Sequence, residues 1–282
     1  MALATEKLGT TWTGEVQTVD PDRARAYAAA TNDDNPAYLS GALAPPLFAV
    51  VPTWQTMSDA LTAMVPSESF LMIVHGEQDM HFHQPLVPGQ RLSTTAEAYS
   101  VRVGRSGTRY TMKVLSESVD TASLVVEQYV TMFIRGMSDG ETAGPDKPDH
   151  GFPRGVRSRP VGTHTVHIDE DQTYRYREAS GDDNAIHLDP AVAASVGLPG
   201  IIVHGLCTMA MTSQAVIATV AAGDPARLRR LAVRFSRPVF PGSDLVTTMY
   251  DAGVEAERHL FAFEAHSGAE LVISNGRADV SP

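Results

Sequence analysis

Cysteine is almost absent from this chain, and its other scarce features each exclude a class of protein. The single cysteine, Cys207, allows no intrachain disulfide and gives no sign of an oxidising compartment. No apolar run reaches the roughly 18 residues that a membrane-spanning helix needs. The N-terminal residues lack the apolar stretch of a signal peptide. We therefore expect a soluble cytoplasmic protein.

Positive charge is also scarce. The chain has 22 basic and 33 acidic residues, a formal net charge of -11, which argues against a nucleic-acid partner. A local group of arginines can still bind an anion, because near charges outweigh the global sign. With 282 residues, 43% of them hydrophobic, the chain can form one large domain or two smaller ones.

The second half of the sequence repeats the first. Three collinear matches carry the repeat: residues 32–36 with 181–185 and Tyr27 with Tyr176, both at an offset of 149, and residues 84–89 with 237–242, at an offset of 153. Chance similarity of turn residues is the alternative, but nearly equal offsets favour a duplication. We expect residues 1–136 to form an N-terminal domain, 137–160 a linker and 161–282 a C-terminal domain.

Each half shows helical segments followed by alternating strands joined by turn residues. This order is typical of an α+β unit built on an antiparallel sheet. The helices are expected at residues 20–31, 47–64, 170–180 and 206–220. The strands are expected at residues 72–84, 92–103, 108–118 and 124–134 in the first half, and at 231–236, 245–254, 259–266 and 270–275 in the second.

A carboxylate, an amide and an imidazole lie within six residues of one loop: Asp182, Asn184 and His187. A carboxylate and an imidazole can exchange protons with one water molecule, and an amide can orient a neighbour. Alone, this pattern is weak, because Asp and Asn often only cap turns. Gly205 strengthens it. A glycine at the start of an apolar helix offers a free N–H to a ligand oxygen, as an oxyanion hole does.

These motifs together resemble a known family. The run Ser180-Gly181-Asp182-x-Asn184-x-x-His187-x-Asp189-Pro190, followed by Pro199-x-Ile201-x-x-His204-Gly205, is similar to that of the (R)-specific enoyl-CoA hydratase 2 and MaoC-like dehydratase family. The first half resembles the vestigial domain of two-domain members. One departure is Ala185, where the family more often has proline; no catalytic atom is lost.

The resemblance implies a double hotdog fold, in which two helix-wrapped antiparallel sheets form one continuous sheet. It implies reversible hydration of a trans-2-enoyl thioester by Asp182 and His187, with Asn184 supporting them and the Gly205 N–H binding the thioester oxygen. The substrate would be an acyl-CoA or acyl-carrier-protein thioester. No further cofactor is expected, and a homodimer is the assembly that relatives suggest. Tyr38 stands where His187 does, so we expect one active site.

Other residues allow alternatives. Arg234 and Arg237 lie in a group of arginines and are candidates to bind the phosphates of coenzyme A, although a solvated face is equally consistent. His81 and His83 form an H-x-H pair without an evident third ligand, so no metal is expected. Cys207 is expected to be a buried structural thiol. A thioesterase, or a non-catalytic thioester binder on the same fold, is the alternative function.

Overall fold

The computed structural model describes residues 2–282. Their packing separates the chain into two compact units. The first unit comprises residues 2–18, 52–84 and 91–149, and the second comprises residues 19–51, 85–90 and 150–282. The domain boundaries predicted from the sequence stay a prediction. The packing assigns residues 19–51, from the first half of the sequence, to the unit that holds the second half.

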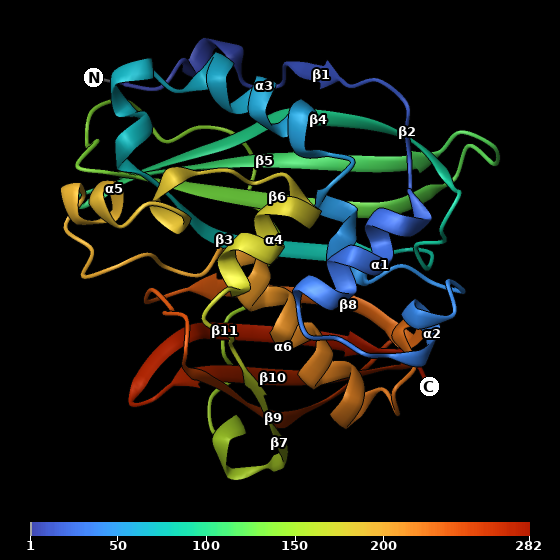
Figure 1. Cartoon of the computed structure of the whole chain (residues 1–282). Helices are drawn as coiled ribbons and strands as arrows, with labels where there is room; N and C mark the ends of the chain where they lie inside the picture. The colour runs from blue at the N-terminus through green and yellow to red at the C-terminus, as the bar shows by residue number, and fades with distance from the viewer. Residues whose placement is uncertain (1) are drawn as a thin grey trace. The chain divides into compact units, whose positions relative to one another are not determined.

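The first unit is an antiparallel sheet packed on a helix. Its strands are β1 (Thr11–Thr13), β2 (Gln17–Thr18), β3 (Ile73–Phe82), β4 (Arg91–Gly104), β5 (Gly107–Ser118) and β6 (Leu124–Arg135). The order is β1-β4-β5-β6-β3, and β2 pairs with β4. Two 3₁₀ turns, η1 (Thr5–Lys7) and η3 (Ser67–Met72), lie at its connections. The helix α3 (Trp54–Met64) packs on β4 and β5 (Figure 1).

Alternation along the strands creates the core of this unit. In β4 the buried residues recur at every second position, as a half-buried strand requires. They meet Met57, Ala60 and Met64 of α3, together with Tyr110 and Met112 of β5. Those three helical residues are therefore core residues of this unit.

The second unit repeats this design around a longer helix. Its strands are β7 (Pro160–His167), β8 (Leu228–Phe235), β9 (Asp244–Glu255), β10 (Arg258–Ser267) and β11 (Glu270–Val280). All pairs are antiparallel, in the order β8-β11-β10-β9-β7. The helix α6 (Gly205–Val220) is apolar on nearly every side and largely buried, and it packs on β7, β8 and β9 (Figure 1). Each unit thus shows the helix-on-sheet arrangement of a hotdog domain, as expected.

Short helices surround α6 within the second unit. They are α1 (Pro21–Ala30), α2 (Pro36–Leu39), α4 (Gln172–Ser180), α5 (Pro190–Ser195), and the 3₁₀ turns η2 (Pro46–Val50), η4 (Val156–Ser158), η5 (Ala185–His187) and η6 (Pro225–Arg227). Proline is the first residue of five of these elements, where its missing N–H costs nothing. No helix in residues 2–282 has both the length and the apolar character needed to cross a bilayer.

The predicted long helix over residues 47–64 is wrong. The chain forms η2, ends it before Pro52, and begins α3 only at Trp54. Proline has no N–H to continue a helix and clashes with the preceding turn, so it separates the two elements. The sequence also missed β7, which lies partly in the predicted linker. The eight predicted strands and the helices α1, α4 and α6 are confirmed to within a few residues.

The helices α1 and α4 show the duplication in three dimensions. Tyr27 and Tyr176, matched in the sequence, face each other with their hydroxyl groups 3.2 Å apart. Arg23 donates to the carbonyl of Ala179, and Gln172, its counterpart, donates to the carbonyl of Ala30, the counterpart of Ala179. This reciprocity is what a local two-fold axis requires, so the duplicated helices pair as the two halves of a homodimer would.

Candidate active site

The segment that carries Asp182 is fixed by local hydrogen bonds at the end of α4. Gly181 ends the helix with φ of 85°, a left-handed conformation that glycine adopts without strain. The Asp182 N–H donates to Ser180 Oγ, and Asp182 Oδ1 accepts from the Asn184 N–H at 3.2 Å. One carboxylate oxygen is thereby held by the backbone.

Asn184 acts on His187 through the short helix between them. Its side chain accepts from the Ile186 N–H and caps η5, whose last residue is His187. The Asn184 side chain is exposed. Asn184 is therefore an N-cap that fixes the start of the short helix ending at His187.

His187 is buried, with 8% of its surface exposed, and one tautomer is favoured. Its Nδ1 lies 2.7 Å from the carbonyl oxygen of Ile202. A carbonyl can only accept, so the proton is on Nδ1 and the lone pair is on Nε2. A nitrogen atom of His187 and a carboxylate oxygen of Asp182 lie within 4.8 Å of each other, close enough for both groups to contact one water molecule.

Burial shifts the two groups in opposite senses. It raises the pKa of Asp182 to about 6, against the Asn184 N–H bond that lowers it. It lowers the pKa of His187 to about 4, because a buried imidazole resists protonation. Near neutral pH the imidazole is a neutral acceptor and the carboxyl group titrates close to its working range. Such a pair can move protons to and from a bound water.

Gly205 is the first residue of α6, so its N–H has no acceptor within the helix. A Cβ atom built on Gly205 would lie 3.4 Å from the ring of Phe235. The Phe235 ring therefore lies beside this N–H at ordinary contact distance. A free N–H at the positive end of a 16-residue helix suits an oxygen on which negative charge develops.

His204, whose contacts the sequence did not predict, lies behind the pair. It is 1% exposed, its ring stacks on His187 with centroids 3.9 Å apart, and its Nε2 lies 3.0 Å from the carbonyl oxygen of Asp182. Burial and the neighbouring His187 lower its pKa to about 3. The only signal in the sequence was its place beside Gly205 in the family motif.

A second set of supporting contacts comes from residues of the first half of the sequence. Arg23 donates through Nε to the Ala179 carbonyl and through Nη2 to the Ser180 carbonyl, both at 2.8 Å. These are the last carbonyls of α4 before Asp182. No motif marked Arg23, because its acceptors lie more than 150 residues away in the chain.

The counterpart of this site in the first half has the same backbone turn but lacks the imidazole. Asp33 accepts from the Asn35 N–H as Asp182 does from that of Asn184, and burial raises its pKa to about 6. Tyr38, fully buried, replaces the imidazole. Asp33, Asn35 and Tyr38 form the same turn as in the second half, without an imidazole beside the carboxyl group to accept a proton.

The first half also lacks the N–H of Gly205. The Ala44 N–H donates to the Leu86 carbonyl as the Val203 N–H does to that of Val239, and Leu86 matches Val239 in the sequence repeat. Two residues beyond Ala44 stands Pro46, the first residue of η2, where the second half has Gly205. Proline has no N–H, so this position has no oxyanion donor.

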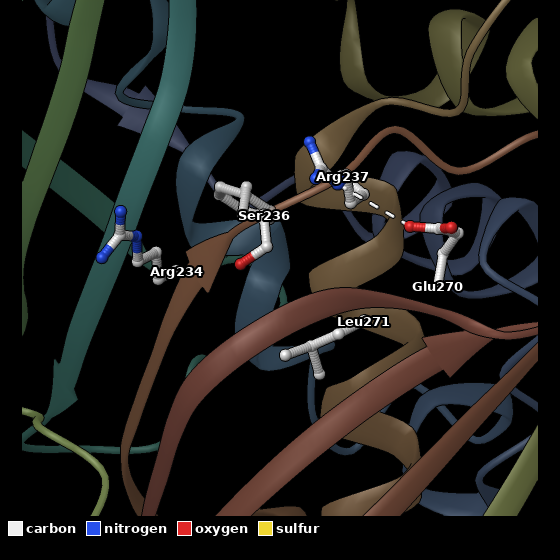
Figure 2. Close-up of a pocket in the computed structure, with 6 residues that line it drawn as sticks. Arg234, Ser236, Arg237, Glu270 and Leu271 are labelled. Atoms are coloured by element: carbon white, nitrogen blue, oxygen red, sulfur yellow. Dashed lines mark ion pairs between the residues drawn. The ribbon is translucent and has the colours of Figure 1, made fainter. Parts of the chain in front are cut away.

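The candidate phosphate ligands line a pocket at the end of β8. Its walls are Arg234, Phe235, Ser236, Arg237, Glu270 and Leu271. Figure 2 shows Arg234 and Arg237 on either side of Ser236, with Arg237 toward Glu270, whose carboxylate lies 3.7 Å away. Phe235 belongs both to this pocket and to the surroundings of Gly205. The pocket therefore adjoins the start of α6.

Two groups of side chains contain residue types that bind metals. Asp182, His187 and His204 offer ligand atoms within 4.8 Å of one another. Nε2 of His204 donates to the Asp182 carbonyl, and its Nδ1 has no hydrogen-bond partner in residues 2–282. His81 and His83 face different carboxylates, those of Asp79 and Glu127. The absence of a metal, expected from the sequence, stays a prediction.

Comparison with known proteins agrees with the motif. A model of the MaoC-like domain matches residues 155–270, and one of the MFE-2 hydratase 2 N-terminal domain matches residues 40–136. The 3-hydroxyacyl-thioester dehydratase Y of Mycobacterium tuberculosis is 31% identical over 214 residues, which cover 73% of this chain and 72% of that protein.

Two further relatives extend the match. The peroxisomal multifunctional enzyme type 2 of Mus musculus is 29% identical over 84% of this chain, which spans only 32% of that enzyme. The crystal structure of a MaoC-like dehydratase from Phytophthora capsici superposes with a TM-score of 0.87 at 26% identity, covering 98% of this chain and 97% of that one. The chain therefore belongs to the family of MaoC-like dehydratases and (R)-specific enoyl-CoA hydratases 2.

Proposed function

We propose that this protein is a hydro-lyase that reversibly adds water to trans-2-enoyl-CoA thioesters and forms (R)-3-hydroxyacyl-CoA. One observation carries the proposal: Asp182 and His187 lie within reach of one water molecule, in a chain that belongs to this family. The tautomer of His187 supports it, because Nε2 is left as a proton acceptor. Gly205 supplies an N–H for the thioester oxygen.

The reaction needs two proton transfers and one site for negative charge. The oxygen of water bonds to C3 of the enoyl group, one proton leaves that water, and one proton reaches C2. As the C–O bond forms, charge moves to the thioester oxygen, where the Gly205 N–H stabilises it. One of the two residues, Asp182 or His187, accepts the proton that leaves the water molecule, and the other helps to deliver the proton to C2. Dehydration follows the same path in reverse.

The test is hydration of crotonyl-CoA, followed as loss of the enoyl absorbance. We expect activity in the wild type and a loss of at least about 100-fold in Asp182→Asn and in His187→Ala, since each removes one partner of the acid–base pair. Activity that persists undiminished in both variants would contradict the proposed mechanism. Release of free thiol without hydration would identify a thioesterase instead.

The carrier of the acyl group is proposed from the pocket beside Phe235. We propose that Arg234 and Arg237 bind phosphate groups of coenzyme A, because guanidinium groups bind phosphate through paired N–H donors. Arg234 has no ion pair in residues 2–282, so its charge is available. Arg237 is partly neutralised by Glu270, so we expect Arg234 to contribute more.

A substrate without phosphate distinguishes lost phosphate binding from a general effect of the Arg234 substitution on folding. We expect Arg234→Gln to raise KM for crotonyl-CoA about 3- to 10-fold, the loss of roughly one charge-assisted hydrogen bond. KM for the N-acetylcysteamine thioester, which carries no phosphate, should not change. Equal effects on both substrates would overturn the assignment.

A cytoplasmic location and a homodimer, both predicted from the sequence, stay predictions.

A further inference from the structure

His204 is a single side chain that contacts both members of the acid–base pair. Its ring stacks on that of His187, with planes inclined by 28°, and its Nε2–H donates to the backbone carbonyl of Asp182. The carbonyl fixes the proton on Nε2. Through its own peptide bond His204 also adjoins Gly205, and it is the N-cap residue of α6.

Stability alone does not explain a histidine at this position. Its Nδ1 atom is buried without a hydrogen-bond partner in residues 2–282. A buried acceptor without a donor costs about 1–3 kcal/mol. A phenylalanine would keep the ring contacts without that cost. The hydrogen bond from Nε2 to Asp182 is the interaction that phenylalanine would lose.

The ring of His204 is held from behind. Tyr176 lies at a centroid distance of 4.9 Å, Tyr27 follows at 5.4 Å from Tyr176, and Phe48 at 5.7 Å from Tyr27. All four rings are buried. Because close-packed rings move only together, this column from residues 19–51 limits the motion of His204 and, through it, of His187.

We propose that His204 is a positioning residue that holds Asp182 and His187 at the separation their shared water requires. The inference rests on the proposed hydratase function and adds to it. Asp182 follows α4 and His187 ends η5, so the loop between them could change their separation. A shift of about 1 Å in a reacting group can lower the rate about 100-fold.

Two variants that differ by one methylene group test the hydrogen bond. In His204→Gln the side-chain amide nitrogen reaches about as far as Nε2 and can still donate to the Asp182 carbonyl. In His204→Asn it stops about one bond short. We expect His204→Asn to lower kcat for crotonyl-CoA at least about 10-fold with KM within about threefold, and His204→Gln to recover most of that loss.

A readout without turnover keeps the inference testable if the proposed function fails. Hydrogen exchange of the backbone amides of residues 181–187 should be faster in His204→Asn than in the wild type and near wild type in His204→Gln. The core strand β10 serves as the internal reference. If the wild type shows no hydration, the proposed function fails while the exchange comparison still tests His204. Equal kcat and equal exchange in the two variants would overturn the proposal.

His204→Phe is the control for folding. It keeps the aromatic column. It removes the unpaired Nδ1 but leaves the Asp182 carbonyl without this donor, and these two effects oppose each other, so its melting temperature should stay close to that of the wild type. Its kcat should nevertheless fall about as far as that of His204→Asn, since neither can donate to Asp182. A His204→Phe variant with wild-type kcat would show that the ring alone suffices and would contradict the proposed hydrogen bond.

Discussion

At the scale of the residue, the burial that raises the pKa of Asp182 also lowers the stability of the folded protein when the carboxyl group is ionised. Its folded pKa of about 6 lies above the value of 3.8 expected for an unfolded aspartate. The folded state therefore favours the protonated form. Below pH about 3.8 both states are protonated and no cost arises. As pH rises from about 3.8 to 6 the unfolded carboxyl ionises first, and stability is lost.

Removal of this carboxyl should stabilise the protein above pH 6. The difference in pKa corresponds to roughly 2–3 kcal/mol at about 1.4 kcal/mol per unit. We expect Asp182→Asn to raise the free energy of unfolding by about that amount at pH 7.5 and by about half as much at pH 5. Urea unfolding at the two pH values measures the difference. A gain that does not depend on pH would contradict the assigned pKa.

At Gly205, substitution by proline removes the backbone N–H that we propose binds the thioester oxygen. Pro46 shows that proline is accepted at the equivalent helix start, and the extended His204 before Gly205 tolerates a following proline. Gly205→Pro should lower kcat about 100- to 1,000-fold by removing the oxyanion donor.

The matched control is Gly205→Ala, which adds the same Cβ beside Phe235 and keeps the N–H. We expect its kcat to stay within about 10-fold of the wild type, because the Cβ meets Phe235 at 3.4 Å, which is ordinary contact. If alanine and proline are equally harmful, crowding against Phe235 is the cause and the N–H has no special function.

At the scale of the element, the pairing of α1 with α4 couples the first half of the sequence to the loop that carries Asp182. Arg23 supplies donors to the last carbonyls of α4, which a helix end otherwise leaves unpaired. Arg23 itself is exposed, so water replaces part of any lost interaction. Its substitution should affect the placement of Asp182 more than the stability of the unit.

We expect Arg23→Ala to lower kcat several-fold and the free energy of unfolding by no more than about 1 kcal/mol. Arg25 is the control on the same helix, since it pairs with the exposed Asp22. Arg25→Ala should leave kcat unchanged. Steady-state kinetics and urea unfolding of both variants check this, and equal kinetics would show that α4 needs no cap from α1.

Helices were predictable where neighbouring residues alone determine their ends, through capping or through a continuous apolar run. Asp20 and Pro21 marked the start of α1, and the apolar run after Gly205 marked α6, since capping and burial are encoded by neighbouring residues. The break at Pro52 was harder to place. One proline can begin a helix or divide two, and only the packing of η2 and α3 in different units decides between these.

At the scale of the whole molecule, one chain carries two copies of the same turn and one complete site. Asp33 and Asp182 have the same backbone contact and the same raised pKa. They differ in their partners, since Tyr38 and Pro46 stand where the second copy has His187 and Gly205. The first copy therefore lacks both the imidazole that would share a water molecule with the carboxyl group and the N–H that would stabilise an oxyanion.

Asp33→Asn and Asp182→Asn form a matched pair that tests this asymmetry. Asp33→Asn should retain kcat within about twofold, whereas Asp182→Asn should lose at least about 100-fold. Titration of Asp182→Asn with crotonyl-CoA should give one site per chain. Loss of activity in Asp33→Asn, or a stoichiometry of two, would show that the first copy takes part in catalysis.

The sequence by itself determined the family and predicted the duplication and the acid–base pair, because these depend on residue types at fixed spacings. It could not show that His204 joins Asp182 to His187, nor that Arg23 and Tyr27 support the site, because those contacts link residues 17 to 157 positions apart that no local pattern relates. Only the folded chain brings such residues together. It also sets the burial that raises the pKa of Asp182 and lowers that of His187.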